Sequence, residues 1–206
     1  MHLLLERLAA GWNSRGDIAS DARSFLLDHG FAATADHCAR VASLAGSLAV
    51  RFGADETGAR VAGWLHDISA VIPVPERLST ARQLEIQVLP EEEAAPMLLH
   101  QKLSACMAAT LFGVTDGTIL AAIACHTTLK PCATQLDKVV FLADKIAWDQ
   151  QGSPPYLGGC LAALEDTRHG ALDRAVLHYL DYLWKGRAAL PALHPWFAMA
   201  YRHMTR

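Results

Sequence analysis

The chain has 206 residues, of which 52% are hydrophobic and 19% are charged, and its formal net charge is −3. This length and hydrophobic fraction are typical of one folded domain with a full core, and they exclude a disordered protein. The acidic balance disfavours a nucleic-acid or anionic-membrane partner, because both bind to basic surfaces. No apolar run of the sequence reaches the roughly 18–20 residues that span a bilayer.

The first residues and the cysteines indicate the compartment. The opening sequence MHLLLERL lacks the basic start and long apolar core of a signal peptide. The five cysteines are odd in number and never spaced as Cys-x-x-Cys, so neither a disulfide framework nor a zinc ribbon is indicated. We therefore expect a cytoplasmic protein.

Apolar residues recur at helical spacing along the whole chain, whereas the alternation typical of strands is too short-lived to predict one. Gly30 and Gly53 fit C-terminal caps, Asp116 fits a helix start, and Ser153 precedes two prolines that fit a first helical turn. We predict an all-α fold, a single domain over residues 1–206. In chain order, its helices are expected near residues 2–12, 17–29, 33–52, 55–69, 75–87, 92–112, 115–127, 134–148, 155–168, 171–185 and 195–204.

Ionisable side chains interrupt the apolar faces of five of these helices. His37, for example, lies four residues before Val41 on the apolar face of its helix, and His66-Asp67 lies in a segment that is apolar nearly all round. An ionised carboxylate that is buried without a partner costs several kcal/mol, so such groups need a counter-charge. Divalent cations would satisfy all of them. The residues concerned are His37, His66, Asp67, His100, His126 and Asp144.

Each of these residues also has a simpler interpretation. A single histidine on an apolar face is more often a core residue than a ligand, and Asp144 could pair with Lys145 or Lys138. The metal interpretation is favoured because all six side chains share the same inward direction. Histidine and aspartate together suit iron, manganese, zinc or cobalt, and the absence of inward cysteines disfavours a structural zinc site. Metal ions in such a site lower the pKa of bound water and bind phosphoryl groups.

Three segments carry a family resemblance: AGWLHDI at 62–68, AAIACHTT at 121–128 and LDKVVFLAD at 136–144. Together with His37 and His100, they resemble the HD-domain superfamily of metal-dependent phosphohydrolases, named after the adjacent histidine and aspartate. More narrowly, the chain resembles the YqeK-type HD hydrolases, which cleave diadenosine tetraphosphate symmetrically into two ADP. The resemblance covers a motif core of about residues 30–148, and it implies a helical bundle around a buried metal site on which the C-terminal helices 155–206 pack.

The resemblance also implies a ligand set and a mechanism. One metal ion is expected to be held by His37, His66, Asp67 and Asp144. Asp67 is expected to bridge to a second ion, whose other ligands are His100 and His126. The usual metal of the family is iron, in a two-iron centre, although manganese or other divalent ions remain open. A hydroxide that bridges the two ions would attack phosphorus, and His66 and Asp67 are the expected catalytic residues.

The chain departs from the family pattern around the substrate pocket. The family has a lysine three residues after the aspartate, where this chain has Ala70, and a glycine after His-Thr-Thr, where it has Leu129. After Asp144, the chain also lacks the Tyr-Ile-Glu-Pro sequence and the arginine of the family, most clearly from Ala147 to Gln150. These changes leave the exact substrate open. Residues that could contact phosphate instead are Arg40, Thr127, Thr128, Lys130 and Lys145, although the threonines could equally bind backbone and the cations could equally be surface charges.

The remaining features have plainer interpretations. The helix near 171–185 is expected to pack in the core, and Glu91 to Glu93 to form a solvated helix start. Trp148 and Tyr156 are expected to pack in the protein rather than stack on a base, while Asp149 and Gln150 are candidates for the pocket rim.

The leading functional hypothesis is a metal-dependent phosphohydrolase with a nucleotide substrate, diadenosine tetraphosphate in the first place. The alternatives are an HD hydrolase that acts on another nucleotide or phosphate ester, a non-catalytic nucleotide-sensing module and, less favoured, a di-iron oxygenase. The expected partner is a small-molecule nucleotide, not nucleic acid or membrane. Pairing into a homodimer is left open, because nothing in the sequence locates an interface.

Overall fold

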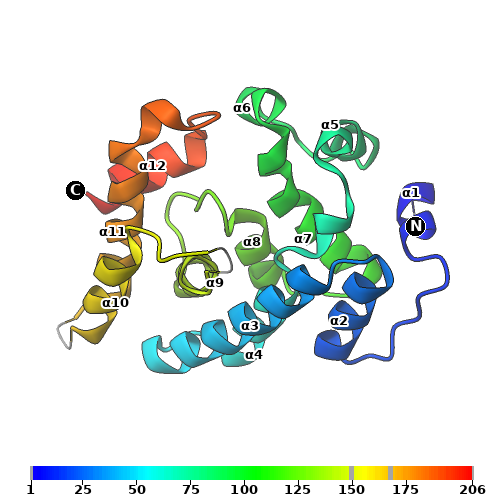
Figure 1. The fold of residues 1–206 in the computed structure, drawn as a ribbon, viewed down its shortest axis with the longest axis horizontal. Helices are drawn as coiled ribbons and strands as arrows, with labels where there is room; N and C mark the ends of the chain where they lie inside the picture. The colour runs from blue at the N-terminus through cyan, green and yellow to red at the C-terminus, as the bar shows by residue number, and fades with distance from the viewer. Residues whose placement is uncertain (1, 149–150, 167–168, 206) are drawn as a thin grey trace.

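The computed structural model describes residues 2–148, 151–166 and 169–205, and within these residues every regular element is a helix (Figure 1). The predicted all-α fold is therefore confirmed. The elements in chain order are α1 (Leu3–Leu8), α2 (Ile18–Asp28), α3 (Ala32–Phe52), α4 (Glu56–Leu65), η1 (Ile68–Val71), α5 (Val74–Gln83), α6 (Pro90–Ala94), η2 (Pro96–Leu99), α7 (His100–Leu111), α8 (Gly117–Cys125), α9 (Gln135–Ile146), α10 (Leu157–Glu165), α11 (Ala171–Lys185), η3 (Arg187–Ala189) and α12 (Pro195–Met204); those labelled η are 3₁₀-helices.

Helix α9 lies at the centre of the bundle, where it contacts α3, α4, α8 and α11. Figure 1 shows α3 and α4 side by side below it, with α10, α11 and α12 together on one side and α1 and α2 on the other. The sequence explains this position, because Val139, Val140, Phe141 and Leu142 are all fully buried. Four consecutive apolar residues reach every side of a helix, so this part of α9 is stable only when other elements surround it.

Close packing of α3 on α4 depends on a glycine. A Cβ atom built on Gly63 would lie 2.5 Å from the Cα of Ala42, which is shorter than any real contact. The two backbones can therefore approach only because residue 63 has no side chain. Helix α3 then ends as expected at Gly53, which adopts the left-handed conformation (φ 70°) as its C-terminal cap.

Two predicted helices are broken in the structure. The helix expected over 55–69 ends at Leu65, and the chain turns at His66 and Asp67 before the 3₁₀-helix η1. The helix expected over 92–112 is three elements, α6, η2 and α7, and Pro96 begins the second of them. A proline has no N–H for the helical ladder, which explains this break.

Smaller differences concern the ends of other helices. The helix predicted from residue 155 begins at Leu157 instead, and its predicted end at 167–168 lies outside the described residues. The helices predicted to end at 87, 127 and 148 end earlier, at Gln83, Cys125 and Ile146.

Glu92 corrects the expectation that Glu91 to Glu93 form a solvated helix start. Its side chain is fully buried, with Oε2 2.8 Å from the Nζ of Lys102 and Oε1 3.3 Å from the Nε2 of His194. The Nδ1 of His194 in turn accepts a hydrogen bond from the backbone N–H of Trp196 in the first turn of α12. Glu92 therefore connects α6 to α7 and to the start of the last helix.

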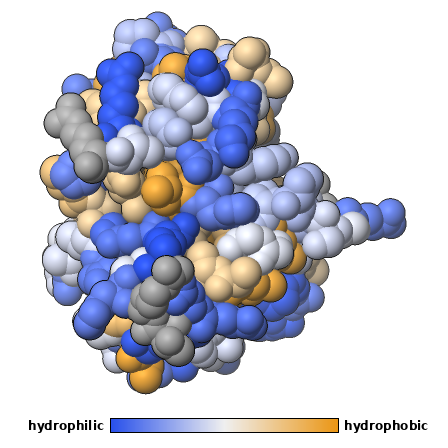
Figure 2. Space-filling view, turned by 90° about the vertical axis from the view of Figure 1, so that its left-hand side faces the viewer, coloured by the Kyte–Doolittle hydropathy of each residue, from blue (hydrophilic) through white to orange (hydrophobic). Residues whose placement is uncertain are grey.

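The C-terminal helices form one face of the molecule. Figure 2 views the molecule from this side, and the face is covered largely by hydrophilic side chains with smaller hydrophobic groups between them. The inner side of α11 is apolar, with Leu172, Ala175, Val176 and Leu180 buried, which confirms the expected core packing of this helix. Within the described part of the chain, no helix combines the length and the apolar character that crossing a membrane needs.

Candidate metal centre

Three of the predicted ligands lie at the ends of helices rather than within them. His66 and His126 directly follow the last residues of α4 and α8, and His100 is the first residue of α7. In all three, the ring Nδ1 is hydrogen-bonded to a backbone carbonyl three residues earlier, so Nδ1–H donates and Nε2 is left for a ligand. The carbonyls are those of Gly63, Met97 and Ile123, at 2.8, 2.7 and 2.8 Å respectively.

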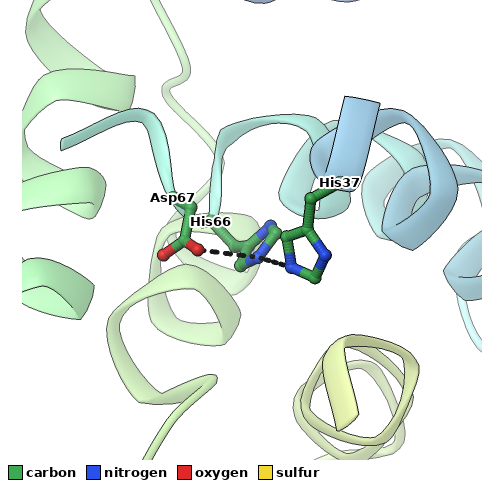
Figure 3. Close-up of side chains that lie close together, drawn as sticks. All are labelled: His37, His66 and Asp67. Atoms are coloured by element: carbon green, nitrogen blue, oxygen red, sulfur yellow. Dashed lines mark hydrogen bonds and ion pairs between the residues drawn. The ribbon is translucent and has the colours of Figure 1, made fainter. Parts of the chain in front are cut away.

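One half of the centre is formed by α3, the α4–η1 turn and α9. The Nε2 of His37, from the second turn of α3, lies 3.2 Å from the Nε2 of His66 and 3.0 Å from the Oδ1 of Asp144. The same Nε2 of His66 lies 3.5 Å from Oδ2 of Asp67 and 3.5 Å from Oδ1 of Asp144. Figure 3 shows His37, His66 and Asp67 pointing toward one another. The four residues expected to hold the first ion therefore meet at one point.

The other half of the centre lies between α7 and α8. The Nε2 atoms of His100 and His126 are 3.1 Å apart, and both lie close to Oδ1 of Asp67, at 3.5 and 3.6 Å. Ligand atoms of these three residues all lie within 4.8 Å of one another. The structure thus brings together the residues expected to hold the second ion.

Asp67 joins the two halves. Its Oδ2 faces His66, and its Oδ1 faces His100 and His126. Because the carboxylate has two oxygens on opposite sides, it can contact one cation with each. The adjacent His66 has a single available nitrogen and can serve only one ion. The geometry fits the arrangement that the resemblance implies.

The second half contains acceptors that face one another. The Nδ1–H groups of His100 and His126 are already donated to carbonyls. Burial lowers the pKa of both imidazoles, that of His100 to about 4, so both rings are neutral at pH 7. Their Nε2 lone pairs and Oδ1 of Asp67 then converge on one point. A divalent cation satisfies such a set of acceptors, so the residues fit a metal.

The first half favours positive charge for a different reason. Burial alone would lower the pKa of His66, but neighbouring Asp67 outweighs it and holds the pKa of His66 well above its usual value. Burial would likewise raise the pKa of both carboxyl groups, yet the cationic groups around them keep the pKa of Asp67 and of Asp144 well below the ordinary range. The negative charge that favours a proton on Nε2 of His66 would equally favour a divalent cation in place of that proton.

A polar pocket of about 300 Å³ opens on the first half of the centre. Lys145 is the cation in its lining, and its Nζ lies 2.5 Å from Oδ2 of Asp144. Although burial would lower the pKa of Lys145, the charge of Asp144 raises it, so the amine stays protonated. The structure places this predicted phosphate contact in the pocket. Among the described residues, the lining consists of His37, Asp67, Asp144, Lys145, Trp148, Tyr156 and Tyr179.

The other predicted substrate contacts differ in their position. Thr127 reaches the centre, since its hydroxyl oxygen lies 2.9 Å from the Nε2 of His100. Thr128 is buried, and its hydroxyl and backbone N–H are bonded to Gln101. Lys130 pairs with the carboxylate of buried Asp137 at 2.9 Å, and exposed Arg40 is not part of the pocket lining. Asp149 and Gln150, the candidates for the rim, lie outside the described residues.

Gln101 was missed by the sequence analysis. It is fully buried, and its Oε1 accepts hydrogen bonds from the backbone N–H groups of Thr127 and Thr128. It therefore fixes the segment that follows His126. Its position directly after His100 was the one available signal, because a polar residue next to a candidate ligand is often part of its support.

Arg77 was missed as well. One of its N–H groups donates to the carbonyl oxygen of Met97 at 3.1 Å, the same oxygen that accepts from Nδ1 of His100. The negative charge of Asp67 also acts on the guanidinium, whose own positive charge helps to lower the pKa of His100. Arg77 belongs to α5, in a segment with no motif, so the sequence contained no signal for its position.

Comparisons with known proteins identify the family of the chain. The model of the HD domain family matches residues 34–149, which include all six clustered residues. A Lactococcus lactis protein from the pepC 5′ region is 42% identical over 144 residues, which cover 70% of this chain and 71% of that protein. A symmetrical bis(5′-nucleosyl)-tetraphosphatase from Halalkalibacterium halodurans is 30% identical over 176 residues, or 84% and 88% of the two chains. The enzyme of the same name from Bacillus subtilis is 34% identical over 112 residues, 53% of this chain and 59% of that one.

A solved structure supports the fold. A crystal structure from Clostridium acetobutylicum, described as a predicted HD superfamily hydrolase involved in NAD metabolism, aligns with a TM-score of 0.79 and 22% identity. The alignment covers 90% of this chain and 96% of that one. An all-α bundle of this shape, with a buried cluster of histidines and aspartates, defines a class of metal-dependent proteins. The chain belongs to the HD-domain family of phosphohydrolases.

Proposed function

We propose that the protein hydrolyses diadenosine tetraphosphate symmetrically to two ADP and uses two divalent cations, iron in the cell. The named relatives support the choice of substrate. An enzyme called symmetrical bis(5′-nucleosyl)-tetraphosphatase aligns with this chain over 84% of its length. The observation that carries the proposal is the position of Asp67, whose Oδ2 faces His66 while its Oδ1 faces His100 and His126.

The six clustered residues would hold the two cations. His37, His66 and Asp144 would serve one ion, His100 and His126 would serve the other, and Asp67 would contact both. Cations bound there would lower the pKa of water and offset the negative charge of the phosphates. The protein would keep each imidazole in the tautomer that leaves Nε2 for the metal, through the three carbonyl contacts of Nδ1.

Two cationic side chains would assist with a substrate as strongly charged as a tetraphosphate. Lys145 lies at the Asp144 end of the centre, and Arg77 lies at the His100 end. The family lysine is absent at Ala70, so these two charges would supply phosphate contacts that the family pattern provides elsewhere. A lysine acts here as a point charge, whereas an arginine can bind two phosphate oxygens.

The test is anaerobic purification with metal analysis, followed at once by an assay with diadenosine tetraphosphate in which chromatography resolves the products. About two metal ions per chain and ADP as the sole product would support the proposal. His66→Ala should lose both metal and activity, because it removes an Nε2 from the first half. His29→Ala is a matched control, since this ring also bonds a backbone carbonyl, that of Phe25, outside the cluster.

Other results would have clear meanings. Bound metal with AMP and ATP as products would keep the substrate and disprove the symmetric position of cleavage. Bound metal with no hydrolysis would disprove the substrate and leave the metal centre in place. A panel of mononucleotides, cyclic dinucleotides and simple phosphate esters would then identify the reaction. A purified protein without metal, unchanged in His66→Ala, would overturn the metal centre itself.

A further inference from the structure

A second pocket, of about 200 Å³, lies beside the metal centre and is lined mainly by carbon atoms. One wall comes from η2, and the other comes from α11, the segment after η3 and the first turns of α12. The apolar side chains of the lining include Met97, Leu98, Leu183, Leu190, Pro191 and Phe197. The wall from Tyr179 to Phe197 lies beyond the residues that match the family model, so it is a feature of this chain's C-terminal segment.

Three residues of this apolar pocket connect it to the metal centre. The carbonyl oxygen of Met97 accepts the hydrogen bond from Nδ1 of His100 at 2.7 Å, and the Thr127 hydroxyl oxygen lies 2.9 Å from Nε2 of the same ring. Tyr179 lines both the apolar pocket and the polar pocket over the metal centre. The apolar pocket is therefore adjacent to the second half of the metal centre, on the side of His100.

Three polar side chains of the apolar pocket, those of Thr127, Thr128 and His194, have partners within the protein. Thr128 is hydrogen-bonded to Gln101, and His194 uses Nε2 for Glu92 and Nδ1 for the backbone N–H of Trp196. The hydroxyl of Thr127 points to His100. A ligand in this pocket would therefore meet apolar and aromatic surface, with little side-chain hydrogen bonding to the edges of its rings.

We propose that the apolar pocket binds one nucleobase of the substrate, by apolar and aromatic contact and without reading the edge of the base. A flat aromatic group suits such a lining, and bases commonly bind by stacking on aromatic side chains, here Phe197 and Tyr179. The inference rests on the proposed function in one respect: the phosphates of the same nucleotide lie at the metal centre. It follows that the protein binds adenine and guanine nucleotides about equally well.

The experiment measures binding rather than turnover. Isothermal titration calorimetry with the metal-loaded protein compares ADP with pyrophosphate, which has the two phosphates of ADP but no nucleoside. Ala192→Trp would fill the pocket, because half-buried Ala192 is part of its lining. Leu193→Trp is the matched control, since Leu193 is the next residue, is 42% exposed and is not part of the lining.

We expect ADP to bind the wild type about tenfold more tightly than pyrophosphate, and Ala192→Trp to remove that advantage. Pyrophosphate binding should change less than about twofold in the same variant, which also shows that the centre is folded. Leu193→Trp should leave both affinities unchanged, and GDP should bind within about threefold of ADP because the lining does not read the base edge.

Two results would overturn the inference: equal affinity of the wild type for ADP and pyrophosphate, or an ADP affinity that survives in Ala192→Trp. If Ala192→Trp also weakens pyrophosphate, Leu190→Ser decides the question, because it removes apolar contact without adding bulk. Failure of the proposed function is distinguishable from these results. A protein that does not cleave diadenosine tetraphosphate, yet prefers ADP over pyrophosphate through this pocket, would keep the base site and lose the substrate.

Discussion

The Nδ1 of His66 lies 2.8 Å from the carbonyl oxygen of Gly63, three residues earlier in α4. The last carbonyls of a helix have no partner within it, so a histidine placed at the helix end can bond one of them with its own ring. This contact fixes the tautomer and directs Nε2 toward the metal centre. His100 and His126 make the same contact with the carbonyl oxygen three residues earlier. Histidines at the ends of short helices therefore form much of the site.

Gly63 should be sensitive to a single methyl group. In Gly63→Ala, the new Cβ would lie 2.5 Å from the Cα of Ala42, so α3 and α4 would have to separate. We expect a loss of about 1–3 kcal/mol in the free energy of unfolding, measured with urea. Metal content should also fall, because His37 and His66 lie on these two helices.

Gly158→Ala is the matched control. Gly158 lies in α10, and a Cβ there would meet nothing within 4 Å. In a helix, this substitution should leave the protein as stable as before or slightly more stable. Equal unfolding curves for the two variants would contradict the account of the α3–α4 contact.

The two halves of the centre should lose metal separately. His37→Ala removes a ligand from the first half and His100→Ala removes one from the second. Each should lower the metal content from about two ions to about one. Asp67→Ala should lower the metal content of both halves, because one oxygen of Asp67 faces each half. Elemental analysis of anaerobically purified variants measures this, and a single ion in the wild type would argue against two halves.

The sequence predicted which residues cluster at the site better than it predicted the helix boundaries around them. Helical periodicity placed His66 and His100 inside long helices, and the six ligand candidates do converge, but these two histidines lie where the predicted helices break. Apolar spacing cannot show such a break, because residues on both sides of it are buried. The fold class followed from the same spacing. Helix α9, with its regular apolar pattern and Asp144 near its end, was predicted to within two residues at each end.

What escaped prediction depends on contacts between distant segments. Gln101 is bonded to residues 127–128, and Arg77 reaches a carbonyl 20 residues away. Glu92 was expected in solvent, yet Lys102 and His194 surround it. A charged residue near a helix start has the same sequence pattern whether it is exposed or paired in the interior, so its burial is decided by the tertiary structure.

Lys145 should affect the binding of phosphate more than the fold. Lys145→Met removes the ammonium group over the polar pocket, and we expect the KM for the substrate to rise about tenfold while the protein remains folded. Loss of this charge would also raise the pKa of Asp144, whose carboxylate it stabilises. Lys138→Met is the control on the same helix, because Lys138 pairs with Asp173 and does not line that pocket. Equal kinetics of the two variants would exclude a role for Lys145 in substrate binding.

Stability at low pH should depend on Glu92. Burial raises the pKa of this carboxyl group, but its bonds to His194 and Lys102 outweigh burial, so the pKa in the folded protein lies below its usual value. A depressed pKa means that the ionised group stabilises the folded state at all pH values above the unfolded pKa of about 4.3. This contribution is lost as the pH falls from there through the folded pKa.

The variant Glu92→Gln tests this contribution. At pH 7 its free energy of unfolding should be about 3 kcal/mol lower than that of the wild type, because the substitution leaves the nearly buried Lys102 without its counter-ion. Glu93→Gln is the matched control, since Glu93 is exposed and pairs with Arg82 on the surface, where ion pairs contribute little. Urea unfolding of the metal-free proteins at pH 7, 5 and 4 should show the gap between Glu92→Gln and the wild type narrowing only at the lowest pH. A gap that is constant from pH 7 to pH 4 would mean that the carboxylate charge of Glu92 is not what joins α6, α7 and α12.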